Sequence, residues 1–194
     1  MNTRSIFQKD TVPFAFYLVT LLTVTLVGDA ALHALGLAFV GRWLGIPGLV
    51  LIGLSLAYSA RKRQLIKQGS PSKYLRFHEY AAWLGSAMVL LHAGIHFGAV
   101  LPWFATLAMV TTVTSGLVGK YLLSRARETS RGRMDALKAS GDKSPEEIEQ
   151  MLFSDAVAIE YMSRWRSIHF PITAAFAILT VGHLVSTFLF WGWR

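Results

Sequence analysis

The chain has 194 residues, of which 53% are hydrophobic and 15% are charged, and its mean hydropathy is +0.43. This balance is too apolar for a soluble domain of this length. The absence of cysteine excludes disulfides, thiol catalysis and cysteine-ligated iron–sulfur clusters within the chain.

Four long stretches carry no charged residue, and they cover residues 11–28, 43–60, 80–119 and 167–193. A helix needs about 20 residues to cross the apolar core of a bilayer. The stretches are continuously apolar, whereas transmembrane β-strands alternate. We therefore predict an all-α integral membrane bundle, one domain over residues 1–194. Its five spans are expected at residues 12–35, 44–61, 77–98, 102–124 and 166–191, with Pro13, Pro47 and Pro102 opening the first, second and fourth.

The positive charges predict how the chain is oriented. Residues 61–76 hold six basic and no acidic residues, and residues 120–166 hold nine basic residues. Under the positive-inside rule both segments are expected in the cytoplasm. This places 17 of the 19 Lys and Arg inside, with only Arg42 and Arg194 outside. The chain is then a multi-pass protein of the inner (cytoplasmic) membrane, with its N-terminus inside and its C-terminus outside.

The predicted cytoplasmic loop, residues 125–165, is expected to start as a basic linker and to end in an amphipathic helix. Ser144, Pro145 and Glu147 form a capping-box pattern. Apolar residues then recur at helical spacing, at Ile148, Met151, Leu152, Ala156 and Ile159. We expect this helix to lie along the cytoplasmic face. It either covers the end of the bundle or docks a peripheral subunit.

Four of the six histidines form two equal intervals, since His78 and His92 are fourteen residues apart and so are His169 and His183. Fourteen helical residues return to within about 40° of the same face and rise about 21 Å. Both helices are expected to run from inside to outside. His78 and His169 then share an inner level, and His92 and His183 share an outer one.

Two facing imidazoles at one depth supply the two axial nitrogen ligands of a haem iron. For a single intramembrane histidine, a helix–helix hydrogen bond or a proton relay is the alternative. Two matched pairs favour two haems over zinc, which gathers three or four ligands at one point. His92 is preferred over His96 as the outer ligand, because His96 lies about 6 Å further along the helix axis.

The segments around these histidines resemble the haem-binding helices of membrane dihaem cytochromes b, and the ferric reductase and NADPH oxidase membrane domains have related spacings. The segments are RFH at 76–78, LHAG at 91–94, RSIHFP at 166–171 and HL at 183–184. With SGLVGKY at 115–121, the chain looks most like small bacterial respiratory cytochrome b subunits. The resemblance covers about residues 73–191 and implies two b-type haems held by the four histidines, with quinone as a possible further ligand.

Other residues near the histidine levels have two interpretations each. Arg76 and Arg166 could pair with haem propionates or simply anchor the inner membrane surface. Gly85, midway between His78 and His92, could admit a porphyrin edge or allow close helix packing. His96 could replace His92, bond a propionate, bind quinone or sit at the wet membrane edge.

Two functions follow as hypotheses. In the first, the chain is an electron-transfer subunit of a membrane oxidoreductase, in which two haems conduct electrons across the membrane between a quinone pool and a protein partner. Because the chain has no flavin or nicotinamide domain, the partner is expected to carry flavin, iron–sulfur or c-type haem groups. In the second, the chain is a non-redox transporter whose histidines relay protons or metal ions.

Overall fold

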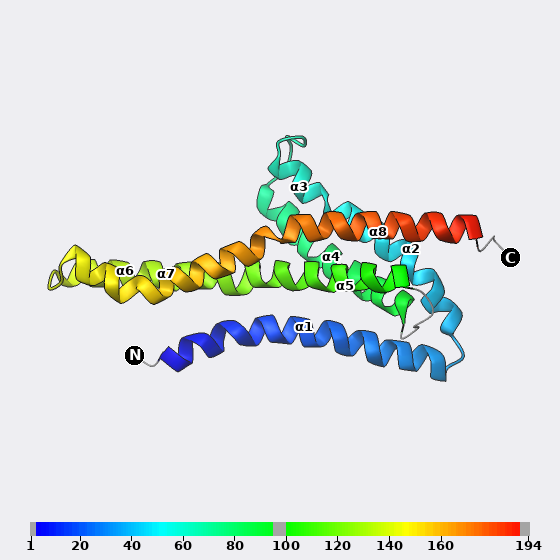
Figure 1. Ribbon diagram of the computed structural model, residues 1–194, viewed down its shortest axis with the longest axis horizontal. Helices are drawn as coiled ribbons and strands as arrows, with labels where there is room; N and C mark the ends of the chain where they lie inside the picture. Colours follow the sequence, from blue (N-terminus) through cyan, green and yellow to red (C-terminus); the bar gives the residue numbers. More distant parts are fainter. Residues whose placement is uncertain (1–2, 95–99, 191–194) are drawn as a thin grey trace.

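The computed structural model describes residues 3–94 and 100–190, with side chains from residue 12 onward except that of Arg166. All regular structure in these residues is helical (Figure 1). The elements are α1 (Thr3–Ala34), α2 (Ala38–Ser55), α3 (Ala57–Lys62), α4 (Pro71–Ala93), α5 (Val100–Leu117), the π-helix η1 (Val118–Leu123), α6 (Ser124–Ser140), α7 (Pro145–Ser167) and α8 (His169–Phe190). The all-α prediction is confirmed.

Four helices are long and apolar enough to cross a membrane: Val12–Ala34, Ala38–Lys62, Val100–Ser140 and Pro145–Phe190. Each overlaps one of the expected spans. The remaining expected span, at 77–98, overlaps α4, which is not among these four, and its residues 95–98 lie outside the described residues. Lys73, Arg76 and Glu79 in its first turns, together with His78 and His92, lower its hydropathy. The chain is thus a helical membrane protein in which α4 is more polar than α2, α5 and α8.

The bundle is built from two helix pairs, α2 with α4 and α5 with α8. The first pair is close because Gly48 and Gly85 meet: a Cβ atom on Gly85 would lie 2.7 Å from the Gly48 carbonyl oxygen. Small residues of this kind let membrane helices approach closely. A core of Leu21, Ala87, Leu90, Ala105, Met109 and Phe176 joins the pairs to each other and to α1.

Of the three prolines that were expected to begin helices, two do not. Pro13 lies inside α1 and Pro47 inside α2, whereas Pro102 is the third residue of α5. The expectation for Pro13 and Pro47 was wrong because membrane helices tolerate an internal proline when neighbouring groups satisfy the freed backbone carbonyl.

The prediction of a linker after residue 125 was also wrong. The helix of α5 continues through η1 into α6, which turns back at Gly141, whose φ is +66°. Figure 1 shows α6 and α7 side by side, projecting beyond the bundle as a hairpin instead of lying across its end. An Arg133–Asp155 ion pair of 2.9 Å joins the two helices.

The predicted start of α7 is confirmed. The backbone N–H of Ser144 donates to Glu147 Oε2 at 2.9 Å, and the backbone N–H of Glu147 donates to Ser144 Oγ at 3.2 Å. This reciprocal pair is a capping box. On the apolar side of α7, Leu152 is buried, and α7 packs against both α6 and η1.

Candidate functional site

Helices α4 and α8 bring the imidazole rings of two histidines close together at one end of the bundle. The ring centroids of His92 and His183 lie 6.4 Å apart, with 58° between the ring planes. The backbones of α4 and α8 make almost no close approach to each other within the described residues. The imidazoles, rather than packed helix surfaces, therefore meet across this side of the bundle.

The separation of these rings suits one metal ion between them. Imidazole–metal bonds are about 2.0–2.1 Å long, and adding the distance from each nitrogen to its ring centre places two opposed rings about 6 Å apart. The observed 6.4 Å is close to this value. A haem iron accepts two such axial nitrogens, so these residues fit that group.

Helix α2 fixes the orientation of His92. The Nδ1 of His92 lies 2.7 Å from the Arg42 carbonyl oxygen. Gly45, one turn further along α2, lies directly against the ring, because a Cβ atom there would be 2.7 Å from Cγ of His92. The ring is thus held between a hydrogen bond and a backbone surface that has no side chain.

The rings of His78 and His169 are also each held by a backbone carbonyl of a neighbouring helix. The Nδ1 of His78 lies 3.0 Å from the Ser55 carbonyl oxygen on α2, and its ring lies 5.6 Å from that of Tyr58. The Nδ1 of His169 lies 3.1 Å from the Thr112 carbonyl oxygen and 2.6 Å from Ser115 Oγ, both on α5.

The position of the proton on each of these three rings follows from the partner. A backbone carbonyl only accepts hydrogen bonds, so Nδ1 of His78, His92 and His169 must carry the hydrogen. The Nε2 atom of a neutral imidazole then has the free electron pair. Histidines that bind metals commonly donate their other N–H to a carbonyl in this manner, which orients the ring and raises its basicity.

Ser115 adds a second acceptor at His169. Its hydroxyl donates to the Thr112 carbonyl oxygen at 2.8 Å, so its oxygen is free to accept from His169 Nδ1. Ser115 is fully buried, and Gly116 beside it also lies against the His169 ring.

The other residues that the sequence predicted near the haems are Gly85, Arg76, Arg166 and His96. Gly85 faces α2 through the contact with Gly48, which is the close-packing interpretation. Arg76 is exposed on the first turns of α4. The side chain of Arg166 and the whole of His96 lie outside the described residues.

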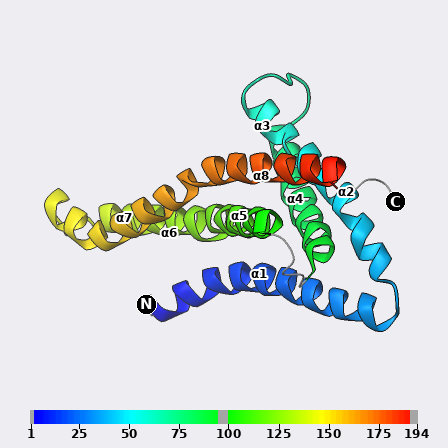
Figure 2. The same cartoon turned by 45° about the vertical axis from the view of Figure 1, so that its right-hand side comes forward.

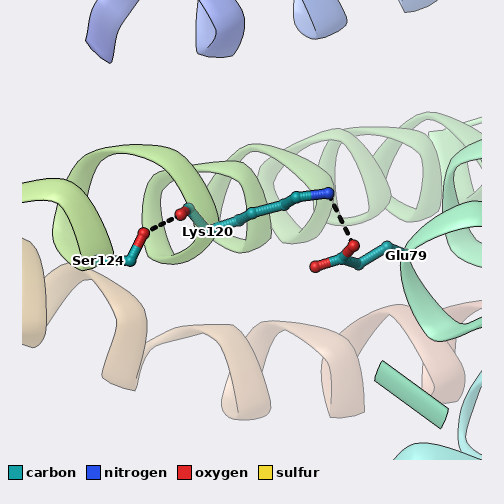
Figure 3. A network of polar contacts seen from close by, with 3 residues as sticks. All are labelled: Glu79, Lys120 and Ser124. Atoms are coloured by element: carbon teal, nitrogen blue, oxygen red, sulfur yellow. Dashed lines mark hydrogen bonds and ion pairs between the residues drawn. The ribbon is translucent and has the colours of Figure 1, made fainter. Parts of the chain in front are cut away.

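A charged pair involves Glu79, the residue after His78 on α4 (Figure 3). Lys120 Nζ lies 2.7 Å from Glu79 Oε2, which ties the π-helix η1 to α4. Ser124 Oγ donates to the Lys120 carbonyl oxygen, one of the carbonyls at this irregular turn. Lys120 also lies over the ring of Tyr121, which stacks on Tyr17 of α1.

His92 and His183 form a pair and are not part of a larger cluster of metal-binding side chains among the described residues. Within the described residues there is no group of three or more His, Cys, Asp or Glu that could hold a metal ion. A zinc site built from protein ligands alone needs more donors than one pair supplies, whereas a haem brings four of its own nitrogens. No protein-family model, no curated protein and no solved structure matches the chain.

Sequence reasoning missed the groups that hold the imidazoles. Ser115 left a signal, since a hydroxyl in an uncharged apolar stretch needs a polar partner. Gly45 left none, because glycine is common in membrane helices for many reasons. The carbonyls of Arg42, Ser55 and Thr112 are invisible in a sequence, because every residue has one.

Proposed function

We propose that the chain is the membrane subunit of a dihaem b-type cytochrome. His78 and His169 bind the iron of an inner haem, and His92 and His183 bind that of an outer haem. Electrons pass across the membrane between a quinone pool and a protein redox partner.

One observation carries the proposal: imidazoles from two helices face each other at the separation of an axial ligand pair, with Nδ1 of His92 bonded to a carbonyl. A proton relay would need a ring free to exchange protons at both nitrogens. The hydrogen bonds of His78 and His169 to backbone carbonyls favour fixed ligands at the inner level as well.

The chain's own residues have three tasks in this function. Helices α2 and α5 fix the proton on Nδ1 of His78, His92 and His169, so that Nε2 of each would be the coordinating nitrogen. The apolar bundle excludes water from the haem faces. Ser115 and the carbonyls accept hydrogen bonds from these Nδ1–H groups, which would orient the rings as ligands and strengthen their donation to a bound iron. Haem iron supplies the one-electron redox chemistry when it is bound.

The partner and the orientation belong to the same proposal. The basic segments at residues 61–76 and 120–166 support a cytoplasmic location for the hairpin side, in the inner membrane. In this function, a partner subunit with flavin, iron–sulfur or c-type haem groups would exchange electrons with the haems.

The test is a reduced-minus-oxidised absorption spectrum of protein purified after haem-replete expression, with haem and protein quantified. We expect the spectrum of low-spin b-type haem and two haems per chain. A colourless, folded protein would refute the proposal and favour the alternative, in which the histidines relay protons or metal ions in a transporter.

A further inference from the structure

The α6–α7 hairpin separates its charges between its two helices. Helix α6 contains five basic and two acidic residues, whereas residues 145–160 of α7 contain five acidic and no basic residues. Helix α6 continues from α5, the chain bends between α7 and α8, and the turn end of the hairpin projects beyond the other helices (Figures 1 and 2). Its outer sides are therefore open to a partner beyond the membrane.

The ion pair within the hairpin fixes which residues lie level. Arg133 Nη1 lies 2.9 and 3.1 Å from the two carboxylate oxygens of Asp155. Positions equally far from the turn on the two helices are therefore at the same height. Three further pairs of residues therefore lie at the same height along the hairpin, to within the rise of one residue, about 1.5 Å. The pairs are Lys138 with Glu149, Met134 with Phe153, and Arg127 with Glu160.

These six residues form one face on each helix. At 100° per residue, Arg127, Met134 and Lys138 fall within about 40° of one another on α6. By the same geometry, Glu149, Phe153 and Glu160 fall within about 40° of one another on α7. Each face thus has an apolar residue between two like charges, basic on α6 and acidic on α7.

The centre of each face is uncovered. Phe153 is 68% exposed and Met134 38% exposed. In the described part of the chain, Lys138 and Glu149 have no ion-pair partner. Glu160 binds Arg164 of its own helix at 2.6 Å, and both side chains are largely exposed. A partner that covers these faces needs opposite charges at the same spacing, with an apolar group between them.

We propose that this partner is a second copy of the chain. Two copies with the same orientation in one membrane are related by a two-fold axis along the membrane normal, and the hairpins run roughly along that direction as continuations of the spans. Each α6 then lies antiparallel to the α7 of the other copy, and the two hairpins form a four-helix bundle. Because the axis preserves height, Lys138, Met134 and Arg127 of one copy meet Glu149, Phe153 and Glu160 of the other.

The proposal does not depend on haem, and charge reversal in the full-length protein tests it. Lys138→Glu or Glu149→Lys places like charges together at both symmetric contacts, so each variant should weaken dimerisation about tenfold. Mixing the two variants, co-expressed with different tags, should restore dimers, because both contacts then join opposite charges. Lys143→Glu, at the turn, is the matched control and should dimerise normally.

Mass measurement in lipid nanodiscs gives the readout. A monomeric wild type would overturn the proposal, and so would dimers that are unaffected by both charge reversals or a mixture of the two variants that does not dimerise. A wild type that is monomeric but retains a soluble protein would assign the faces to that protein.

A second readout uses the absence of native cysteine. Chains with Met134→Cys and chains with Phe153→Cys should cross-link to each other far more than each does to itself. Equal self-cross-linking would contradict the antiparallel arrangement.

Discussion

At the scale of residues, the orientation of the imidazoles depends on groups that carry no charge. The buried hydroxyl of Ser115 lies 2.6 Å from Nδ1 of His169 on α8, and it donates its own hydrogen bond to the Thr112 carbonyl. The oxygen of Ser115 therefore faces the ring as an acceptor. This arrangement raises electron density on the imidazole, which stabilises the ferric form of a bound iron.

Replacing Ser115 by alanine should leave the inner haem bound, because the Thr112 carbonyl still accepts from His169. The midpoint potential of that haem should rise on the order of tens of millivolts, since the ligand becomes less basic. Redox titration followed by absorption measures this. Thr114→Ala is the control, because among the described residues the Thr114 hydroxyl donates only to the Val110 carbonyl of its own helix. A midpoint potential unchanged from that of the wild type would show that Ser115 does not influence the haem ligand His169.

Gly45 should be intolerant of any side chain. An added Cβ would lie 2.7–2.9 Å from three atoms of the His92 ring, so Gly45→Ala must push the ring away from its place opposite His183. We expect loss of the outer haem, or a high-spin spectrum for it, with the inner haem retained. Gly53→Ala on the same helix meets nothing within 4 Å and serves as the control. Two intact low-spin haems in Gly45→Ala would show that His92 is not held there.

At the scale of elements, α2 is the platform for both histidines of α4. It supplies the Ser55 carbonyl to His78, the Arg42 carbonyl to His92, and the contact of Gly48 with Gly85 midway between them. The equal spacing of the two histidines and the central glycine are thus explained by one helix–helix interface.

This interface predicts the effect of Gly85→Ala. The new methyl group would lie 2.7 Å from the Gly48 carbonyl oxygen and 2.9 Å from Ile52 Cγ1, so α2 and α4 must separate. We expect a loss of about 1–3 kcal/mol in the free energy of unfolding in detergent, and weaker binding of both haems. Gly132→Ala, in open space on α6, should change neither. Full stability with selective loss of one haem would instead favour the interpretation in which Gly85 borders a porphyrin.

Sequence patterns predicted the elements unevenly, for physical reasons. Apolar length is a strong signal, so the uncharged stretches located four long helices. Helix α6 escaped prediction because it is polar on most sides and is stabilised by its pairing with α7, as in the Arg133–Asp155 contact. The capping box at Ser144 was predictable because its hydrogen bonds are local. The carbonyl partners of the histidines depend on how helices pack, which no local pattern encodes.

At the scale of the whole molecule, the distribution of charge defines two ends. The hairpin and residues 61–76 hold most of the basic residues, and we place them in the cytoplasm. A cysteine introduced at Ser140 should therefore resist an impermeant thiol reagent in intact cells and react after the membrane is opened. A cysteine at Gly36, between α1 and α2, is the converse control and should react in intact cells. The opposite labelling pattern would invert the orientation.

The central claim is that each iron lies between one histidine of α4 and one of α8. Haem counts in double variants test it most directly. Removing one level with His78→Ala and His169→Ala should leave one haem per chain, the outer one, and removing the outer level should leave the inner one. Removing both histidines of one helix, with His78→Ala and His92→Ala, should leave none. One haem remaining in that helix variant, or none remaining when a single level is removed, would contradict the pairing.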